Sequence, residues 1–521
     1  MQTEVRDRYD VIVVGAGVGG CIAAARIAQF GVNPRTGEKL KVALFEWGPY
    51  HKGDPNRGYG IPSRRASFDG MPNELTRRYT LPWGTLGMVG GATQWAGMIA
   101  FPPTQIDFDH WQAETGVDWT WEKFTAPLME VNEMWHPYPE PVEVHSPGQL
   151  LFRDAAMALK YPVRQGGQAK LNCPRCGDCN GRMCRYDAKS TPLVTYVPIA
   201  EREGVEIIGE APVDKILIEK KGARPVATGV AYRQGGTLRR ANADKVIAAC
   251  GYNGTPRLLY RSGYGPREKV AGELLVENRN VGANQVSSVN STGVDVLFDR
   301  QIIDENIGVH NTYYIAKTDS TGRNLLIIGE GLGTREGTRA FPEDFALLPV
   351  APDFGREHKQ YMKSALTHVG HIRAEVAKNA LRGEITPEGA STFGGPRGEG
   401  ERGGVRRELL EKNHPDILET LREGQEVARK LLDYMKPKKV AGLDRLPEIL
   451  STNHNHGTCR AGASRDNSVV NSDLESHDVD NLFIFDASVV PFQCTANPSM
   501  PTAAVCSYGW RRMVAKHLSR A

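Results

Sequence analysis

The sequence contains no long apolar run that is free of both charge and glycine. Its most apolar stretch, residues 11–28, includes four glycines and Arg26, and it follows an acid-bearing segment at residues 4–10. A membrane-spanning helix needs about 20 mostly apolar residues, and a secretory signal needs a basic start. We therefore interpret residues 11–28 as a strand and a helix. We expect a cytoplasmic protein, unless a partner subunit carries an export signal.

Charge of one sign is not in excess either. The 521 residues include 64 Lys and Arg against 61 Asp and Glu, a formal net charge of +3, and no basic tail is present. Nucleic acid is therefore not an expected partner. Hydrophobic residues make up 40% of the chain, as in an ordinary globular protein. A chain of this length exceeds the size of one core, so we expect two domains or one large composite domain.

Cysteine is too sparse and too unevenly placed for a disulfide framework along the whole chain. Nine are present, an odd number, and four of them fall within residues 173–184. The sulfurs of Cys173, Cys176, Cys179 and Cys184 can converge on one ion or cluster. Compared with the ferredoxin pattern, one extra residue precedes the fourth cysteine, and Arg185 replaces the proline after it. Three interpretations stay open: an iron–sulfur cluster, structural zinc, and free thiols or local disulfides.

A dinucleotide-binding pattern lies near the start of the sequence. Residues 9–14 form a short, almost continuously apolar run, which is typical of a parallel strand covered on both faces. Four glycines follow, and then an Ala-rich stretch, residues 21–30, that predicts a helix. Gly15 permits a tight turn, Gly17 lets a pyrophosphate approach the backbone, and Gly20 lets the helix pack closely on the strand. The alternative is a glycine-rich turn without a ligand.

A second predicted strand, residues 41–45, ends at Glu46. The carboxylate of Glu46 can accept hydrogen bonds from the adenosine ribose hydroxyls, and it disfavours a 2′-phosphate. Glu46 lies 26 residues beyond Gly20, later than the usual spacing of about 20, and residues 33–39 are interpreted as a turn insertion. These features predict dinucleotide binding without choosing between FAD and NAD.

Further motifs occur in the order found in the glucose-methanol-choline (GMC) oxidoreductases, and the sequence resembles this family over its flavin-binding scaffold. Residues 87–95 resemble the family's second flavin-contacting loop, and residues 246–263 resemble its strand, turn and helix that return to the cofactor. At the carboxyl end, residues 454–460 resemble the family's histidine, two residues, then Gly-Thr-Cys. Residues 481–488 resemble the strand that ends at the flavin. The joint occurrence of these motifs identifies the family.

The resemblance implies an α/β fold. It consists of a Rossmann-like FAD-binding domain of the GMC and p-hydroxybenzoate hydroxylase type, and a second α+β substrate-binding domain with an antiparallel sheet. We place the FAD-binding domain at residues 1–295 and 445–521, with the cysteine-rich segment 173–184, and the substrate-binding domain or cap at residues 296–444. The cofactor-binding residues it implies are Gly15, Gly17, Gly20, Glu46, Gly90, Gly91, Thr93, Trp95, Asp486, Ala487, Asn497 and Pro498.

Some relatives attach FAD covalently through a histidine just before the tryptophan of the second flavin-contacting loop. This chain has Gln94 at that position, so we expect non-covalent FAD. The last helix is expected to start at Asn497 and Pro498. Its amino terminus would stabilise negative charge on the reduced flavin.

The resemblance also implies alcohol oxidation by hydride transfer to flavin N5. The hydroxyl proton must leave as the hydride departs, so a base must lie within hydrogen-bond reach of that oxygen. His454 matches the family's catalytic histidine, and Asn497 matches its second position, a histidine or an asparagine. An amide is not a base near neutral pH, so we expect His454 to take the proton and Asn497 to orient the substrate oxygen. The alternatives are a structural His454 and a helix-capping Asn497, and His456 is expected to point elsewhere if the strand is extended.

The sequence constrains the substrate class less than it constrains the cofactor. A secondary alcohol of a sugar, glycoside or ring compound is favoured by Asn497, because relatives that oxidise sugars and sterols commonly have asparagine there. The electron acceptor is oxygen or a partner protein. One alternative is a dehydrogenase subunit that passes electrons through an iron–sulfur cluster at residues 173–184, and another is a GMC-type lyase with non-redox FAD. Residues 384–404 predict a surface loop, and residues 408–436 predict a helix with a solvated face.

Overall fold

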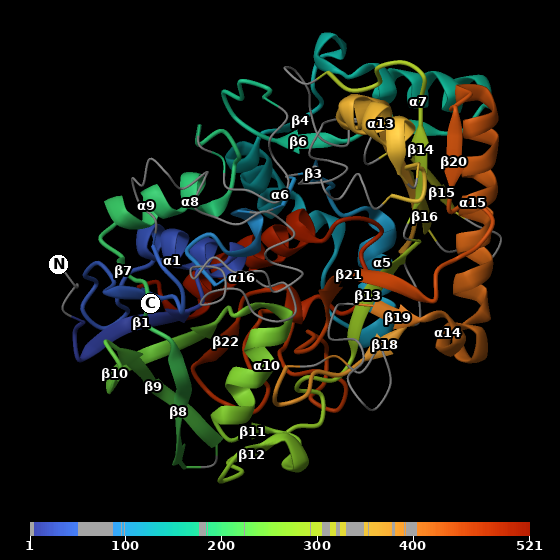
Figure 1. Cartoon of the computed structure of the whole chain (residues 1–521). Helices are drawn as coiled ribbons and strands as arrows, with labels where there is room; N and C mark the ends of the chain where they lie inside the picture. The colour runs from blue at the N-terminus through green and yellow to red at the C-terminus, as the bar shows by residue number, and fades with distance from the viewer. Residues whose placement is uncertain are drawn as a thin grey trace.

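The computed structural model of the protein describes residues 5–50, 87–94, 96–97, 99–176, 184, 186–222, 224–291, 293–304, 313–318, 324–329, 348–352, 354–377, 381–389, 391 and 404–520. Two large sheets dominate this part of the chain (Figure 1). In that view the first sheet lies at the lower left and the second at the right. No helix within the described residues is long and apolar enough to cross a membrane.

The first large sheet has the strand order β7-β2-β1-β10-β9-β8, and β22 pairs with β10. Its strands are β1 (Arg8–Val14), β2 (Val42–Phe45), β7 (Glu206–Ile208), β8 (Val213–Lys221), β9 (Arg224–Gln234), β10 (Thr237–Ala248) and β22 (Leu482–Ile484). β7, β2, β1, β10 and β22 are parallel, whereas β9 and β8 extend the sheet in antiparallel fashion. The parallel part contains both strands predicted at the dinucleotide motif.

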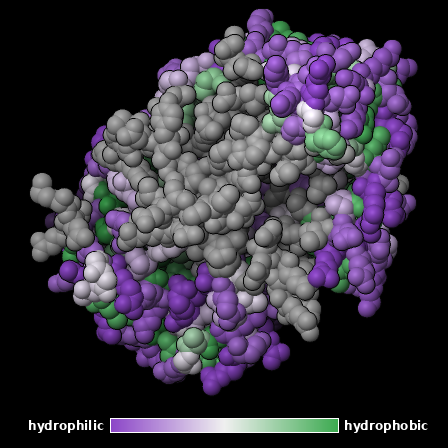
Figure 2. Space-filling view, in the orientation of Figure 1, coloured by the Kyte–Doolittle hydropathy of each residue, from purple (hydrophilic) through white to green (hydrophobic). Residues whose placement is uncertain are grey.

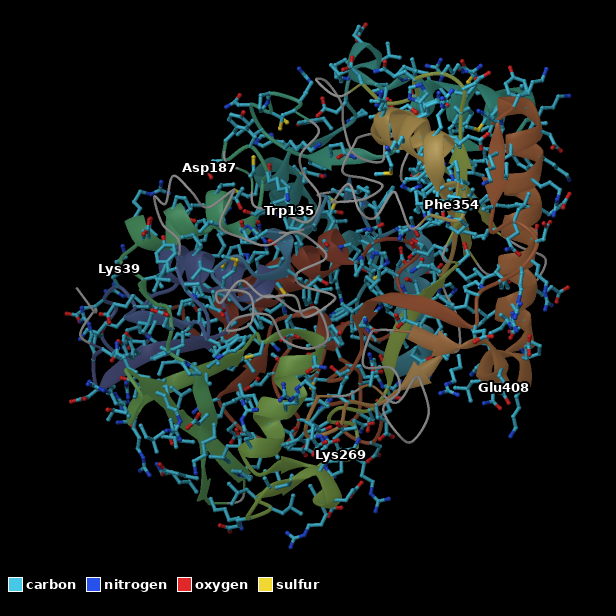
Figure 3. All side chains as sticks on the ribbon, viewed as in Figure 1. Lys39, Trp135, Asp187, Lys269, Phe354 and Glu408 are labelled. Atoms are coloured by element: carbon cyan, nitrogen blue, oxygen red, sulfur yellow. The ribbon has the colours of Figure 1, made fainter. Side chains whose placement is uncertain are left out.

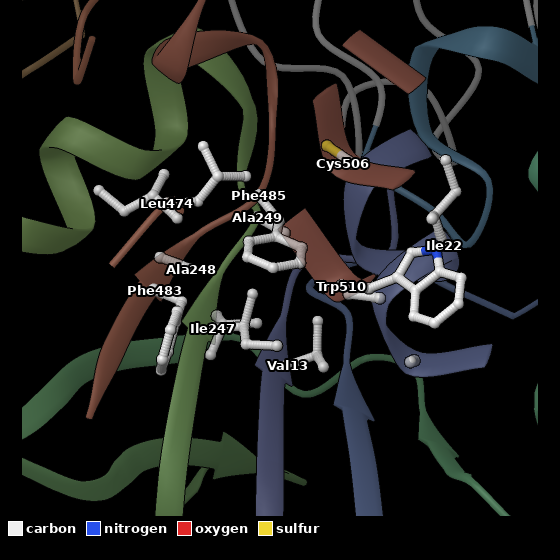
Figure 4. Close-up of a cluster of buried hydrophobic side chains, with 14 of the residues drawn as sticks. Val13, Ile22, Ile247, Ala248, Ala249, Leu474, Phe483, Phe485, Cys506 and Trp510 are labelled. Atoms are coloured by element: carbon white, nitrogen blue, oxygen red, sulfur yellow. The ribbon is translucent and has the colours of Figure 1, made fainter. Parts of the chain in front are cut away.

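Helices cover the parallel strands on the side of α1 (Val18–Phe30) and α16 (Ser499–His517), which pack against each other. Figure 4 shows Ile22 and Trp510 of these helices in one buried cluster with Val13 and Ile247 of the strands. α6 (Trp121–Trp135) packs on α16, and α9 (Val197–Arg202) packs on α1. The central strand of a covered sheet has no solvent side, which explains the unbroken apolar run in β1.

The second large sheet is antiparallel, with the order β19-β21-β13-β17-β16-β15-β5. Its strands are β5 (Val163–Gln165), β13 (Gln285–Asn290), β15 (Tyr313–Thr318), β16 (Asn324–Ile328), β17 (Val369–Ala377), β19 (Gly404–Arg406) and β21 (Ile449–His456). The short strands beside it are β14 (Val294–Leu297), β18 (Arg382–Gly383) and β20 (Lys439–Ala441). The second sheet therefore extends beyond the limits of residues 296–444 that we predicted for the substrate-binding domain.

The two faces of the second sheet have different chemistry. On β17, Ile372, Ala374 and Val376 lie in the core with α7 (Pro147–Ala158), α14 (Arg407–Asn413) and α15 (Pro415–Met435). Because side chains alternate along a strand, Arg373 and Glu375 point to the opposite face. The second sheet therefore presents charged side chains on the face away from its helical core.

The predicted helix at residues 408–436 is two helices, α14 and α15, separated at His414. Pro415 cannot donate a main-chain hydrogen bond to the preceding turn, and it occupies the first position of α15. Hydrophilic side chains cover most of the outer edge formed by α15 (Figure 2). Glu408, near the start of α14, and Lys39, before β2, lie at opposite sides of the molecule (Figure 3). Of the predicted loop at residues 384–404, only 384–389, 391 and 404 are described.

The remaining described strands form two small sheets, of three and two strands, and four further α-helices are described. They are β3 (Ile99–Ala100), β4 (Pro137–Tyr138), β6 (Gly167–Ala169), β11 (Tyr264–Gly265), β12 (Val276–Glu277), α5 (Gln105–Thr115), α8 (Pro192–Thr195), α10 (Gly251–Arg261) and α13 (Gly355–His368).

Candidate active site

The turn between β1 and α1 has the geometry of a phosphate cradle. Gly15 has φ +101°, and a Cβ there would lie 2.5 Å from the carbonyl oxygen of Ala249. A Cβ on Gly20 would lie 1.8 Å from the carbonyl oxygen of Gly15. At Gly17, in contrast, a Cβ would meet nothing within 4 Å, and Gly17 caps α1 without a side-chain hydrogen bond or an acidic residue in the first turn. Main-chain N–H groups of α1 are thus available to a pyrophosphate.

Glu46 lies beside this turn at the end of β2. Its carboxylate is 7% exposed and accepts hydrogen bonds from the main-chain N–H groups of Ala16, at 2.7 Å, and Gly48, at 3.0 Å. Burial raises the pKa of Glu46, and these main-chain donors oppose the rise. Each carboxylate oxygen has further acceptor capacity, so both can bind ribose hydroxyls as well.

The second glycine-rich loop packs directly on the first. The Gly90 N–H donates to the carbonyl oxygen of Ala16 at 2.7 Å, and a Cβ on Gly91 would lie 2.9 Å from Gly17 Cα. The Thr93 hydroxyl donates to the Gly90 carbonyl at 2.6 Å, which closes the loop. The structure therefore brings both predicted glycine loops to one place. Trp95 lies outside the described residues.

Gln94 is directed into the protein. It is 3% exposed, and its Nε2 donates to the Thr191 hydroxyl at 2.9 Å. The ammonium of Lys189, a 2% exposed residue, donates to the main-chain oxygen of Gln94 at 3.1 Å. These contacts fix the loop end where a covalently linking histidine stands in some relatives.

Asp486 joins the end of β22 to the start of α10. It accepts hydrogen bonds from the Thr255 hydroxyl at 2.6 Å and from the Gly251 and Ser488 N–H groups at 3.0 and 2.8 Å. Burial raises the pKa of Asp486. Ala487 begins the short 3-10 helix after it (Ala487–Val489), and its carbonyl oxygen accepts a hydrogen bond from the Gly457 N–H at 3.3 Å.

His454 and Asn497 meet where the second sheet faces the start of α16. The distance from His454 Nε2 to Asn497 Nδ2 is 3.1 Å. The other ring nitrogen, Nδ1, lies 2.7 Å from Glu375 Oε1 and 3.2 Å from the Ser288 hydroxyl. The N-cap of α16 is Pro498, so the side chain of Asn497 is aimed at the histidine. The predicted pair is thus extended by two residues from the second sheet.

The backbone at His454 explains why the two histidines of this motif point in different directions. Residues two apart on an extended strand share a face, so extension alone would place His454 and His456 together. His454 instead has φ +61°, and the pairing of β13 with β21 is irregular at this point. His456 Nε2 donates to the carbonyl oxygen of Phe492 at 3.0 Å, and burial lowers its pKa to about 4. The side chains point in different directions as predicted, but the predicted reason, an extended strand, is wrong, and the bulge separates them.

Asn497 is held in place by α5. Asp107 on α5 accepts hydrogen bonds from the Thr495 N–H at 2.7 Å and from its hydroxyl at 2.9 Å. The same carboxylate accepts from the Thr104 N–H at 2.6 Å and forms a capping box at the start of α5. Burial raises the pKa of Asp107. Sequence reasoning missed Asp107, although the Thr-x-x-Asp spacing of a capping box is visible in the sequence.

The cysteine-rich segment is described only in part. Cys173, Cys176 and Cys184 are partly exposed, and Cys179 lies outside the described residues. Within the described part, no group of three or more His, Cys, Asp and Glu side chains is arranged to hold a metal ion. The iron–sulfur cluster and the zinc site therefore stay predictions.

The structure combines a dinucleotide cradle on a parallel sheet with a histidine on a second sheet and an amide just before α16, an arrangement typical of an oxidoreductase with a dinucleotide cofactor. The profile described as GMC oxidoreductase matches residues 9–289, and its carboxyl-terminal counterpart matches residues 408–506. The chain belongs to the GMC oxidoreductase family. It is an FAD-dependent oxidoreductase that acts on CH–OH donors, and the cradle, Glu46 and the open space at Gly17 fit that cofactor.

Curated relatives and solved structures align along nearly the whole chain. An uncharacterized GMC-type oxidoreductase of Mycobacterium tuberculosis is 25% identical, over 95% of this chain and 97% of its own. A long-chain-alcohol oxidase of Arabidopsis thaliana is 22% identical, over 99% of this chain and 69% of its own. The crystal structure of pyridoxine 4-oxidase from Mesorbium loti has a TM-score of 0.69 at 17% identity, over 98% of this chain and 99% of its own. The predicted fold class is confirmed.

Proposed function

We propose that the protein oxidises a secondary alcohol of a sugar, glycoside or ring compound to a carbonyl, with His454 as the general base. The observation that carries this proposal is the 3.1 Å approach of His454 Nε2 to Asn497 Nδ2 at the start of α16. Bound FAD supplies the acceptor for the hydride that leaves the carbinol carbon with both bonding electrons.

His454 and Asn497 have different roles at the substrate oxygen. A hydroxyl between them donates its proton to His454 Nε2 and accepts a hydrogen bond from the amide of Asn497. As the proton moves to Nε2, the carbon–oxygen bond becomes a carbonyl. The start of α16, which has no acidic residue in its first turn, offers a positive dipole end to negative charge that develops beside it.

The polar face of the second sheet supports a polar substrate. The sheet face that carries Glu375 also carries Asn290, its partner in the strand register, and Arg373. Of these, the Arg373 guanidinium, whose side chain is 12% exposed, is a donor for a molecule with several hydroxyl groups. The name of the plant relative, long-chain-alcohol oxidase, supports alcohol oxidation in general.

The test follows flavin absorbance under anaerobic conditions while a panel of sugars, glycosides and ring alcohols is added. The unmodified protein is expected to bleach with a secondary alcohol, and His454→Gln is expected to bleach about 10²–10⁴-fold more slowly. His371→Gln is the matched control, because His371 lies on β17 and pairs with Asp295 at 3.1 Å. Full bleaching by His454→Gln would refute the base, and flavin that no alcohol bleaches would favour the lyase alternative.

Two further measurements complete this test. Turnover with oxygen and with an artificial acceptor distinguishes an oxidase from a dehydrogenase, and iron and sulfide analysis of anaerobically prepared protein tests the electron-transfer alternative. We also propose that FAD is bound non-covalently, because Gln94 is engaged with Thr191. Acid precipitation should therefore release the flavin into the supernatant.

A further inference from the structure

Glu375 is a buried carboxylate with no part in the chemistry proposed above. It lies on β17, its side chain is 1% exposed, and its Oε1 is 2.7 Å from His454 Nδ1. We infer that Glu375 is the positioning residue of the base: it holds a proton on Nδ1, keeps Nε2 free to accept the substrate proton, and stabilises the ring once it is charged. This inference rests on the proposed role of His454.

Hydrogen-bond directions on the two sides of the ring agree on one tautomer. The amide nitrogen of Asn497 can only donate, so Nε2 must accept at the 3.1 Å contact. A carboxylate can only accept, so Nδ1 must carry the proton that it shares with Glu375. When a substrate hydroxyl takes over the lone pair of Nε2, the Asn497 amide is released to donate to the substrate oxygen.

The contact depends on the order of strands in the second sheet. β17 and β21 flank β13, so the strands that carry Glu375 and His454 are about 10 Å apart. The two side chains meet above Ser288 of β13, whose hydroxyl lies 3.2 Å from His454 Nδ1. A small residue at 288 leaves room for this crossing, and the bulge at His454 turns the ring toward it.

Glu375 stays ionised although its side chain is buried. Burial alone would raise the pKa of Glu375, but the hydrogen bond of His454, its charge once the ring is protonated, and the contributions of Arg373 and Ser288 hold that pKa below its usual value. The remaining titratable residue on this strand face, His371, is paired with Asp295 at 3.1 Å. A constant negative charge beside Nδ1 favours the imidazolium that forms when Nε2 takes a proton. Carboxylate, imidazole and hydroxyl stand in the same relation in Ser-His-Asp enzymes.

The main experiment compares Glu375→Gln with the unmodified holoenzyme. Glutamine keeps the shape of the side chain and removes its charge. We expect kcat to fall roughly 10²–10⁴-fold with a smaller change in KM. The pH profile of kcat/KM should also change, because Nδ1 of the ring no longer faces a charged acceptor. Glu375→Asp should recover part of the rate.

A second readout does not depend on turnover. In holoenzyme labelled with ¹⁵N-histidine, the His454 signals should show a proton on Nδ1 and none on Nε2 at alkaline pH. In Glu375→Gln the His454 signals should show both tautomers, because an amide can donate to Nδ1 as well as accept from it. Asp295→Asn is the matched control, because it removes a carboxylate from another histidine pair in the same sheet region. It should leave both the pH profile and the His454 signals unchanged.

The outcomes distinguish this inference from the proposed function. If His454→Gln retains the normal rate, the proposed function fails. If His454→Gln loses the rate while Glu375→Gln keeps the normal pH profile, only the role of Glu375 is wrong. If Glu375→Gln does not retain FAD, the ¹⁵N-histidine spectrum of the unmodified holoenzyme is the deciding measurement. A resting His454 ring that is protonated on Nε2 would overturn the inference.

Discussion

His454 and His456 stand two residues apart on β21, yet their surroundings give them opposite properties. His454 is placed to change its protonation state between Glu375 and Asn497. His456 is fully buried, and burial lowers its pKa to about 4. A histidine that remains neutral near pH 7 can hold the Phe492 carbonyl without responding to the proton taken up next to it.

The low pKa of His456 predicts a pH-dependent stability. Between its ordinary pKa of about 6.5 and about 4, the unfolded chain binds a proton at His456 that the folded protein does not bind. The free energy of unfolding should therefore fall as pH decreases through this window, by up to roughly 3 kcal/mol. In His456→Gln, whose amide can still donate to Phe492, this contribution should vanish. Thermal midpoints of both proteins at pH 7, 6 and 5 measure the difference, and parallel slopes would contradict it.

Sequence motifs could predict the residues whose partners are close in the chain, but not those joined by sheet register. The glycines of the β1–α1 turn and Glu46 act within one strand–helix–strand unit, so spacing alone indicated them. Glu375 lies 79 residues from His454. Only the placement of β13 between β17 and β21 brings the two together, and no local pattern encodes that order. The one visible sign was Arg373 and Glu375 alternating with apolar residues.

At the scale of elements, the position of Asn497 depends on how α5 is joined to the segment before α16. Asp107 accepts from two groups of Thr495 while also capping α5. A single carboxylate thus ties a helix start to the segment that presents the amide to His454. The first turn of α5 and the segment before α16, residues 495–497, should therefore move together.

Asp107→Ala should therefore affect both stability and catalysis. It leaves the main-chain N–H groups of Thr104 and Thr495 without their acceptor, at a cost of about 2–4 kcal/mol in the free energy of unfolding. The loosened segment should lower kcat, because Asn497 no longer has one fixed position. Asp109→Ala on the exposed side of α5 is the control, with an expected cost within about 0.5 kcal/mol. Equal midpoints for the two variants in urea unfolding would refute this link.

The predicted elements agree best with the structure where the pattern is strongly periodic. The predicted strand at residues 9–14 and helix at 21–30 correspond to β1 and α1, which begin one and three residues earlier. The predicted helix at 408–436 failed at one point, because its periodicity continues across His414 although Pro415 starts a new helix. Proline at a first helical position was the available indication.

At the scale of the whole molecule, the second sheet is assembled from distant parts of the chain. Its main strands come from residues 163–165, 285–290, 313–318, 324–328, 369–377, 404–406 and 449–456. Its core likewise includes Phe152, Val289 and Leu450 from outside residues 296–444. The family pattern is weak between the two flavin-binding regions, which made this range look like a separate unit. Sheet pairing across the range limits was not visible in the sequence.

We therefore predict that a fragment of residues 296–444 does not fold by itself. It lacks β13, which pairs with β17, and it cuts β14. Losing Phe152, Val289 and Leu450 alone removes roughly 5–9 kcal/mol of apolar burial, comparable to the entire stability of a typical domain. Far-UV circular dichroism and amide NMR dispersion of the purified fragment, compared with the full chain, provide the measurement. A cooperative thermal transition in the fragment would show that residues 296–444 are an independent domain after all.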